Sequence, residues 1–295
     1  MLSKRAIVGL LIEPQRSADA ALSFVLPKVA HDAALDLVLW MHGRQNERTA
    51  HAIKHAHFSG LRRCRLRLIN LEERLGVRAL DYELVNSLVL NASFWGLVRS
   101  AAGPHATHVL QFQPDSASCG IPSAAALLSS LREYDFCGAP WPHMGVGNNG
   151  FSLQRIARFA QLAEAHGDAY QALTHSLRGS RRPLRTDKII HMLCRGSFAG
   201  GDSMVRVAQQ LRERGVGGIP ARGDRLRDAG CKLCPVRVAV GFAVETVTHP
   251  SPFGFHKPWG SASGRSWMRN ESIACSAVAR RVKALLGAAA MTRAN

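Results

Sequence analysis

The segment 252–259 places a histidine beside a lysine, between aromatic residues and prolines that restrict the backbone. Neutral imidazole is a common metal ligand, and a lysine ammonium is a compact charge suited to phosphate. His256 and Lys257 could therefore meet the two parts of a complex between a metal ion and a diphosphate. The alternative is a packed aromatic turn in which His256 is only hydrogen-bonded.

Asp115 is a second candidate, because it follows an apolar run at residues 107–112 that is typical of a buried strand. In parallel α/β sheets, ligands bind beyond the carboxyl ends of the strands. A carboxylate at that position supplies the oxygen ligand that Mg²⁺ and Mn²⁺ prefer. Asp115 is therefore a candidate for binding a divalent cation.

The loop 145–150 has the glycine spacing of the dinucleotide-binding fingerprint, but its context differs. That fingerprint follows the first strand of a βαβ unit and precedes an acidic residue that comes after a second strand. Here the loop follows residues 140–144, which contain two prolines, so dinucleotide binding is not expected. Glycine and asparagine still allow a backbone to approach a ligand closely. The alternative is a tight turn without a ligand.

The seven cysteines are odd in number and irregularly spaced, so a disulfide framework is not expected and a reduced, cytoplasmic setting fits better. Cys231 and Cys234 form a lone C-x-x-C pair. Because a structural zinc site needs a second pair, two buried thiols are the better interpretation. His51 and His55 lie one helical turn apart, but without the glutamate of a zinc hydrolase they indicate a surface helix.

The formal net charge is +17, from 38 Lys and Arg against 21 Asp and Glu. A surface this basic attracts phosphate-bearing partners: nucleic acid, an anionic membrane face, or an anionic substrate such as a sugar nucleotide. Nucleic acid is not expected, because the chain shows no helix-turn-helix pattern and only 6% aromatic residues. The apolar run that follows Lys4 and Arg5 is too short for a signal peptide. No apolar run approaches the ~20 residues that span a bilayer.

The elements that must position these residues alternate along the chain. Strand-like runs lie at residues 6–12, 35–41, 65–69, 107–112, 134–141 and 241–247, and helical spacing lies at 17–31, 51–59, 82–100, 121–132, 152–166, 187–195 and 203–214, with a last helix after Asn270. The alternation in the first part predicts a mostly parallel sheet with helices on both faces. Asp115 then lies at the carboxyl end of the fourth strand.

Four motifs occur in order: residues 111–116 (QFQPDS), 134–141 (YDFCGAPW), 146–153 (VGNNGFSL) and 252–259 (PFGFHKPW). Together they resemble a poorly characterised family of proteins regarded as glycosyltransferases, found in bacteria, viruses and eukaryotes. The segments 12–16 and 41–46 also resemble that family, and the match covers residues 5–262. Any one motif is weak, but the ordered set is specific.

The resemblance implies a GT-A-like fold, which is a single α/β domain with a Rossmann-type, mostly parallel central sheet and helices on both faces. Residues 1–118 would form the nucleotide-binding half and residues 119–262 the acceptor and catalytic half. Residues 263–295 would form a basic helical tail, which could rest on the inner face of an anionic membrane or equally pack on the domain.

The resemblance also implies transfer of a hexose from a nucleotide-sugar donor to a hydroxyl of a carbohydrate or glycan acceptor. Asp115 and His256 would hold Mn²⁺ or Mg²⁺ on the diphosphate, and Asp115 is also expected to be catalytic. Metal-binding motifs of this kind have two acidic residues, and Gln113 stands at the position of the first. Asp187 would be the catalytic base of an inverting reaction, with Thr186 in place of the usual glutamate. The alternative for Asp187 is a surface ion pair or a charge at the N-terminus of a helix. The residues expected to bind the nucleotide sugar are Glu13, Arg16, Gln113, Asp115, Asn148, Asn149, Gly150, Lys257 and Trp259.

A second hypothesis, from a different class, is a non-catalytic module that binds nucleotides or carbohydrates on the same fold. The residues Gln113 and Thr186 motivate it, because each replaces an acidic side chain of the expected motifs. The sequence does not identify the donor sugar, the nucleobase, the acceptor, the oligomeric state or the stereochemical outcome.

Overall fold

The computed structural model describes residues 6–13, 19–59, 64–77, 79–80, 82–141, 145–146, 148–176, 186–196, 202–225 and 229–291, and the structural statements below refer to these residues.

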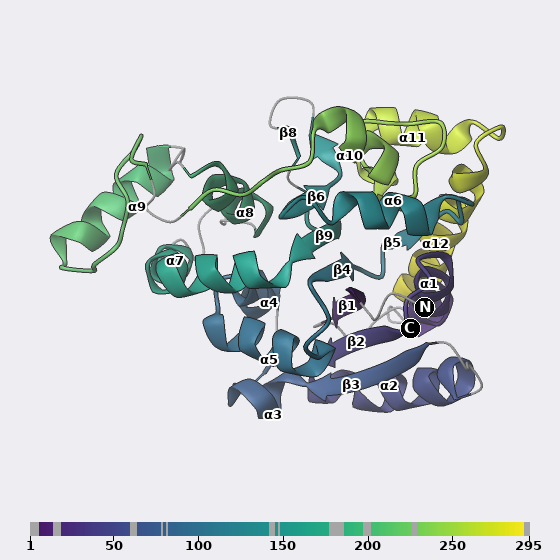
Figure 1. Ribbon diagram of the computed structural model, residues 1–295, viewed down its shortest axis with the longest axis horizontal. Helices are drawn as coiled ribbons and strands as arrows, with labels where there is room; N and C mark the ends of the chain where they lie inside the picture. The colour runs from purple at the N-terminus through teal and green to yellow at the C-terminus, as the bar shows by residue number, and fades with distance from the viewer. Residues whose placement is uncertain are drawn as a thin grey trace.

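A six-stranded sheet forms the centre of the protein, with the strand order β3-β2-β1-β4-β9-β6 (Figure 1). Its strands are β1 (Ile7–Glu13), β2 (Leu37–His42), β3 (Arg65–Asn70), β4 (His108–Phe112), β6 (Phe136–Gly138) and β9 (Phe151–Arg155). The first four are mutually parallel, and β9 runs antiparallel to both β4 and β6. β2 and β4 are buried along their whole length, as is usual for parallel strands that are covered on both faces.

Helices cover both faces of this sheet (Figure 1). On one face, α5 (Ala92–Ala102) packs against α7 (Ile156–Ser176), and the ring centroids of Trp95 and Phe159 are 5.3 Å apart. On the other face lie α1 (Asp19–Asp32) and α2 (Glu47–Ile53). The predicted fold class, a mostly parallel α/β sheet with helices on both faces, is confirmed.

The remaining elements connect and extend this core. They are η1 (Arg44–Asn46), η2 (Lys54–Phe58), α3 (Leu71–Leu75), α4 (Tyr82–Leu88), α6 (Ala124–Leu131), β7 (Pro140–Trp141), β8 (Gly145–Val146), α8 (Thr186–Arg195), α9 (Asp202–Glu213), α10 (Val236–Phe242), η3 (Pro258–Gly260), α11 (Ala262–Arg269) and α12 (Ala274–Met291).

A second, three-stranded sheet follows the carboxyl end of β4, with the order β10-β11-β5. Its strands are β5 (Ser116–Ser118), β10 (Ala243–Val244) and β11 (Gly254–His256). Next to it, the rings of Phe151, Phe242 and Phe253 pack together with centroids 5.5 to 5.9 Å apart. This aromatic cluster fixes the small sheet against the start of β9.

The prediction of a single helix over residues 152–166 is wrong at its N-terminal end. Residues 151–155 form β9, and α7 begins only at Ile156. Phe151 and Leu153 alternate with the polar Ser152 and Gln154, but all four are buried. The period of two covers only five residues and continues into the helix without a turn, so the helical pattern concealed it.

Six of the seven cysteines are paired, which contradicts the expectation of free thiols. The disulfides are Cys119–Cys275, Cys137–Cys234 and Cys194–Cys231, and Cys64 is free and buried. The partners are 156, 97 and 37 residues apart, so local spacing could not indicate them. Disulfides persist in oxidising environments, so the pairing removes the thiol-based ground for a reduced compartment.

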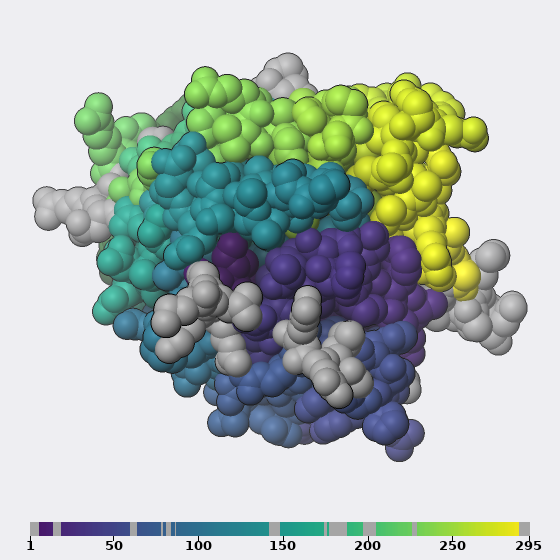
Figure 2. Space-filling model, turned by 45° about the vertical axis from the view of Figure 1, so that its right-hand side comes forward, coloured from purple at the N-terminus to yellow at the C-terminus, as the bar shows by residue number. Residues whose placement is uncertain are grey.

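The C-terminal helix α12 packs beside α1 and β5, so the last helix lies next to the first (Figure 2). Ala279 and Val282 of α12 are fully buried, and the Arg281 guanidinium lies 4.4 Å from the centroid of the Phe24 ring. The buried side of this basic helix therefore faces the domain. Among the described helices, none is both long and apolar enough to cross a bilayer.

Candidate functional site

Two residues 141 positions apart in the chain meet because β5 and β11 pair. The strands are antiparallel, with Ser116 opposite His256. Asp115 immediately precedes β5, and its carbonyl oxygen accepts a hydrogen bond of 2.9 Å from the backbone N–H of Lys257. The pairing therefore carries Asp115 to the end of β11, beside His256 and at the carboxyl end of β4.

Glu245 reaches the same place through the other neighbour of β11. β10 runs parallel to β11, with Val244 opposite Phe255, so the next residues along the two chains are Glu245 and His256. As a result, His256 lies between two carboxylates. Its Nε2 atom is 3.4 Å from Oδ1 of Asp115, and its Nδ1 atom is 3.4 Å from Oε1 of Glu245.

These carboxylates hold His256 in its charged form. Burial alone would lower the pKa of the imidazole, but the charges and hydrogen bonds of Asp115 and Glu245 outweigh it and raise the pKa to about 10. The Nε2 atom of His256 also lies 3.0 Å from Oε1 of Gln113, so this amide oxygen is a third neighbour of the imidazole ring. In this state, His256 is a cation that lies between two carboxylates and beside the Gln113 oxygen.

Asp115 and Lys257 form the solvent-facing side of the cluster. Burial opposes ionisation of Asp115, but His256 and Lys257 hold the pKa of its carboxyl below the usual value. The Asp115 side chain is still 24% exposed, and the Lys257 side chain, whose Nζ atom is 4.0 Å from Oδ2, is 53% exposed. The backbone of Lys257 is left-handed, with φ of 41°. An anion from solvent could therefore reach both side chains.

Gly150 allows the start of β9 to lie directly against the His256 ring. A Cβ atom on this glycine would be 2.2 Å from Cδ2 of His256 and 2.3 Å from Nε2. Gly254 serves a similar purpose in β11, since a Cβ there would be 2.4 Å from the Phe151 ring. The absence of a side chain at Gly150 thus lets the backbone at this position lie against the His256 ring.

Asn148 and Trp141 fix the position of Glu245. Their side-chain N–H groups donate to Oε2 of Glu245, at 2.6 Å from Asn148 and 3.3 Å from Trp141. Oδ1 of Asn148 accepts from the backbone N–H of Gly150. Glu245 was missed in the sequence analysis, although the strand predicted at 241–247 contains it. No motif marks it, because its partners come from distant segments.

Asn149 points away from this cluster, into a buried network of uncharged side chains. Its Oδ1 atom accepts hydrogen bonds from Ser152 and from Nε2 of Gln154. The same Nε2 atom donates to Oε1 of Gln111 on β4. This network joins β4 to β9 behind the candidate site, so the Asn149 side chain is occupied within the protein.

Glu13 and Trp259 are the other predicted site residues whose side chains the structure describes, and β1, which ends at Glu13, pairs with β4. Glu13 is buried at the carboxyl end of β1, and its carbonyl accepts a 2.8 Å hydrogen bond from the Asn46 side chain. Trp259 lies in η3, where its carbonyl accepts from Arg265. The backbone of Asp187 is in the first turn of α8, but its side chain is outside the described part of the structure, as is the whole of Arg16.

A divalent cation bound beside His256 would need His256, Gln113 and Asp115 as its ligands. Two neighbouring ligands of an octahedral ion, each about 2.1 Å from it, are roughly 3 Å apart. The distances from His256 Nε2 to Gln113 Oε1 and Asp115 Oδ1 are 3.0 and 3.4 Å. Within the described residues, no group of three or more His, Cys, Asp or Glu could hold a metal, so a cation here would also need the Gln113 amide. His256 would have to lose its proton first, because the ligand is neutral imidazole.

The chain resembles known proteins only in part of its sequence and in its fold. A family model described as a protein of unknown function (DUF5672) matches residues 69–194, which is less than half of the chain. No match was found among curated proteins. One similar solved structure is mouse xyloside xylosyltransferase 1 in its apo form, with 12% identity, 63% of this chain and 81% of that chain covered, and a TM-score of 0.40.

A second similar structure is 4-diphosphocytidyl-2C-methyl-D-erythritol synthase from Anaerococcus prevotii DSM 20548. It shows 12% identity, with 64% of this chain and 84% of that chain covered, and a TM-score of 0.38. At such TM-scores the likeness carries no weight for function. The function proposed below depends on the geometry and motifs of the chain itself.

Proposed function

We propose that this protein is a glycosyltransferase, which moves a sugar from a nucleotide-sugar donor to a hydroxyl group of a carbohydrate acceptor. The observation that carries the proposal is the convergence of Gln113, Asp115, His256 and Lys257 beyond the carboxyl end of β4. Ligands of open α/β sheets bind at this end of the strands. Two of the four ordered motifs that resemble glycosyltransferases, the first and the last, contribute these four side chains.

Departure of the nucleoside diphosphate is the step that these residues would assist. The exposed Lys257 ammonium can turn from Asp115 towards a phosphate oxygen and stabilise the charge on the leaving group. Gln113, Asp115 and His256 would hold a divalent cation such as Mn²⁺ or Mg²⁺. When bound, that cation would supply further positive charge at the diphosphate. Glu245 is a positioning residue, because it orients His256 and Asn148.

Attack by the acceptor hydroxyl needs a general base, and Asp187 is our candidate for an inverting reaction. General-base catalysis contributes on the order of 10²–10⁴ in rate. Asp187→Asn should therefore lower kcat by about 10²–10⁴ while leaving donor affinity nearly unchanged. The measurement is release of nucleoside diphosphate with a panel of sugar nucleotides and saccharide acceptors. Asp168→Asn, an exposed position on α7, is the matched control.

Equal loss of turnover and donor affinity in the Asp187 variant would remove this residue from the base role. Undiminished activity in excess chelator would exclude the cation and leave Lys257 and His256 as the groups that stabilise the leaving diphosphate.

Gln113 supports a second candidate function, a non-catalytic module that binds nucleotides or carbohydrates. Its neutral amide occupies the position where an acid is expected and lies 3.0 Å from Nε2 of His256. Hydrolysis of a sugar nucleotide in the absence of an acceptor separates the two functions. Slow hydrolysis that Asp115→Ala abolishes would support the enzyme, whereas tight donor binding without any hydrolysis or transfer would support the module.

A further inference from the structure

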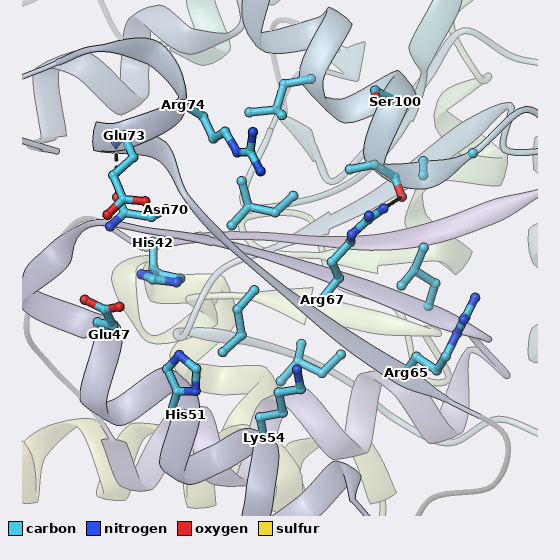
Figure 3. A pocket seen from close by; sticks show the side chains of 18 residues that line it. His42, Glu47, His51, Lys54, Arg65, Arg67, Asn70, Glu73, Arg74 and Ser100 are labelled. Atoms are coloured by element: carbon cyan, nitrogen blue, oxygen red, sulfur yellow. Dashed lines mark hydrogen bonds between the residues drawn. The ribbon is translucent and has the colours of Figure 1, made fainter.

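The outer edge of β3 borders a groove that the proposed transfer reaction does not use. A cavity of about 800 Å³ follows this strand, with α2 on one side and α5 on the other (Figure 3). β3 is the terminal strand of the six-stranded sheet, and it pairs only with β2 among the described strands. The groove therefore follows one edge of the central sheet between two helices, and along this edge Leu66 is buried and Leu68 is half-buried.

The backbone on this outer edge has unused hydrogen-bonding groups. The N–H of Arg65 donates to the carbonyl of Asp36 at 3.0 Å, so the backbone groups of Arg65 face β2. Successive residues of a strand point their backbone groups to alternate sides. Those of Leu66 and Leu68 therefore point outward, and within the described residues they have no hydrogen-bond partner. An unpaired edge of this kind is a template for another strand.

The charges along the groove specify which kind of strand it would accept. Four cationic side chains line it against two anionic ones. The cations are Lys54, Arg65, Arg67 and Arg74, and the anions are Glu47 and Glu73. All six are exposed, and they come from both sides of β3: Lys54 from the segment that follows α2, and Arg74 from α3 (Figure 3). A row of carboxylates laid beside β3 would meet positive charge from both sides.

We propose that this groove binds an extended, acidic segment of a partner protein by strand addition to β3. Backbone hydrogen bonds to Leu66 and Leu68 supply the pairing. Carboxylates on alternate side chains contact Arg65, Arg67 and Lys54. Main-chain bonds give affinity in this mode of recognition, and the side chains give specificity.

The test uses a fluorescent eight-residue peptide of alternating glutamate and valine. It should bind saturably, and amide exchange measured by NMR should slow at Leu66 and Leu68, while Arg67, already paired with β2, should not change. The double variant Arg65→Glu/Arg67→Glu should weaken binding by roughly tenfold or more. Arg206→Glu/Arg237→Glu, which makes the same charge change at exposed positions on α9 and α10, should bind as the wild type does.

A peptide with N-methyl groups on the edge facing β3 keeps its charges but cannot pair, so it should not bind. This comparison needs no protein variant and remains valid if a double variant does not fold. Equal binding of the methylated peptide would overturn strand addition. Binding of an oligonucleotide but not of the peptide would replace the proposal with a polyanion site. No binding of either would leave Arg65 and Arg67 as charges that protect an edge strand from aggregation.

Discussion

At the scale of single residues, Gly150 provides a sharp test of how the site is built. A methyl group added here would collide with the His256 ring, which has carboxylates on both sides and little room to move. Gly150→Ala should therefore abolish nucleotide binding and destabilise the fold by about 1–3 kcal/mol. Nucleotide binding and thermal melting measure the two effects separately.

Gly96 is the matched control for this substitution. It is exposed on α5, and a Cβ there would meet nothing within 4 Å. Gly96→Ala should leave nucleotide binding unchanged and stabilise the protein by up to about 1 kcal/mol, because alanine favours the helix. Normal nucleotide binding by the Gly150 variant would show that the His256 ring does not need its observed position.

His108 makes the stability of the fold depend on pH. It is 1% exposed at the start of β4, and burial lowers its pKa to about 4, although a hydrogen bond with the carbonyl of Tyr134 partly opposes this. Between pH 4 and 6.5 the unfolded chain therefore binds a proton that the folded chain does not, so stability falls as the pH is lowered. Acidification from pH 7 to pH 5 should cost about 2 kcal/mol through this residue.

The variant His108→Gln keeps a hydrogen-bonding side chain but cannot titrate. Denaturant unfolding at pH 7 and pH 5 should show that its loss of stability on acidification is about 2 kcal/mol smaller than that of the wild type. An identical pH dependence in both proteins would contradict the assignment to His108.

At the scale of elements, sequence patterns were sufficient for the parallel strands of the central sheet but not for its antiparallel strand β9 or for the small sheet. β1, β2 and β4 are buried apolar runs, so composition alone predicts them. β5, β10 and β11 have only two or three residues each, too few for a periodic pattern. Their pairing, which is a property of the folded chain, brings Glu245 to His256.

The motifs predicted the proximity of Asp115 and His256, but they did not indicate how the surrounding residues are used. Asn149 looked equivalent to Asn148 in the glycine loop, yet one asparagine joins a buried network and the other holds Glu245. Both asparagines lie just before β9, so the register of β9 decides which partners each side chain meets. The register depends on the pairing of β9 with β4 and β6, which a single sequence does not reveal.

At the scale of the whole molecule, the three disulfides join segments far apart in the chain. They connect the residue that follows β5 to α12, β6 to the segment before α10, and α8 to residue 231. Closing loops of this size removes freedom from the unfolded chain, with a typical stabilisation of about 2–4 kcal/mol for each disulfide. Reduction should therefore lower the melting temperature markedly.

The thiol count tests this pairing directly. Protein produced in an oxidising compartment and denatured without reductant should show one reactive thiol, that of Cys64, and after reduction it should show all seven. Cys64→Ala should give no reactive thiol before reduction. Seven reactive thiols in the unreduced, oxidatively produced protein would contradict the pairing.

The central claim is that Asp115, at the end of β4, and the His256–Lys257 pair form one diphosphate-binding site. The most direct measurement is a thermal-shift panel of nucleoside diphosphates with and without Mn²⁺, on the wild type, Asp115→Ala and the exposed control Glu271→Ala. At least one diphosphate should raise the melting temperature of the wild type and the control but not of Asp115→Ala. A shift that survives in Asp115→Ala, or no shift in any protein, would contradict the claim.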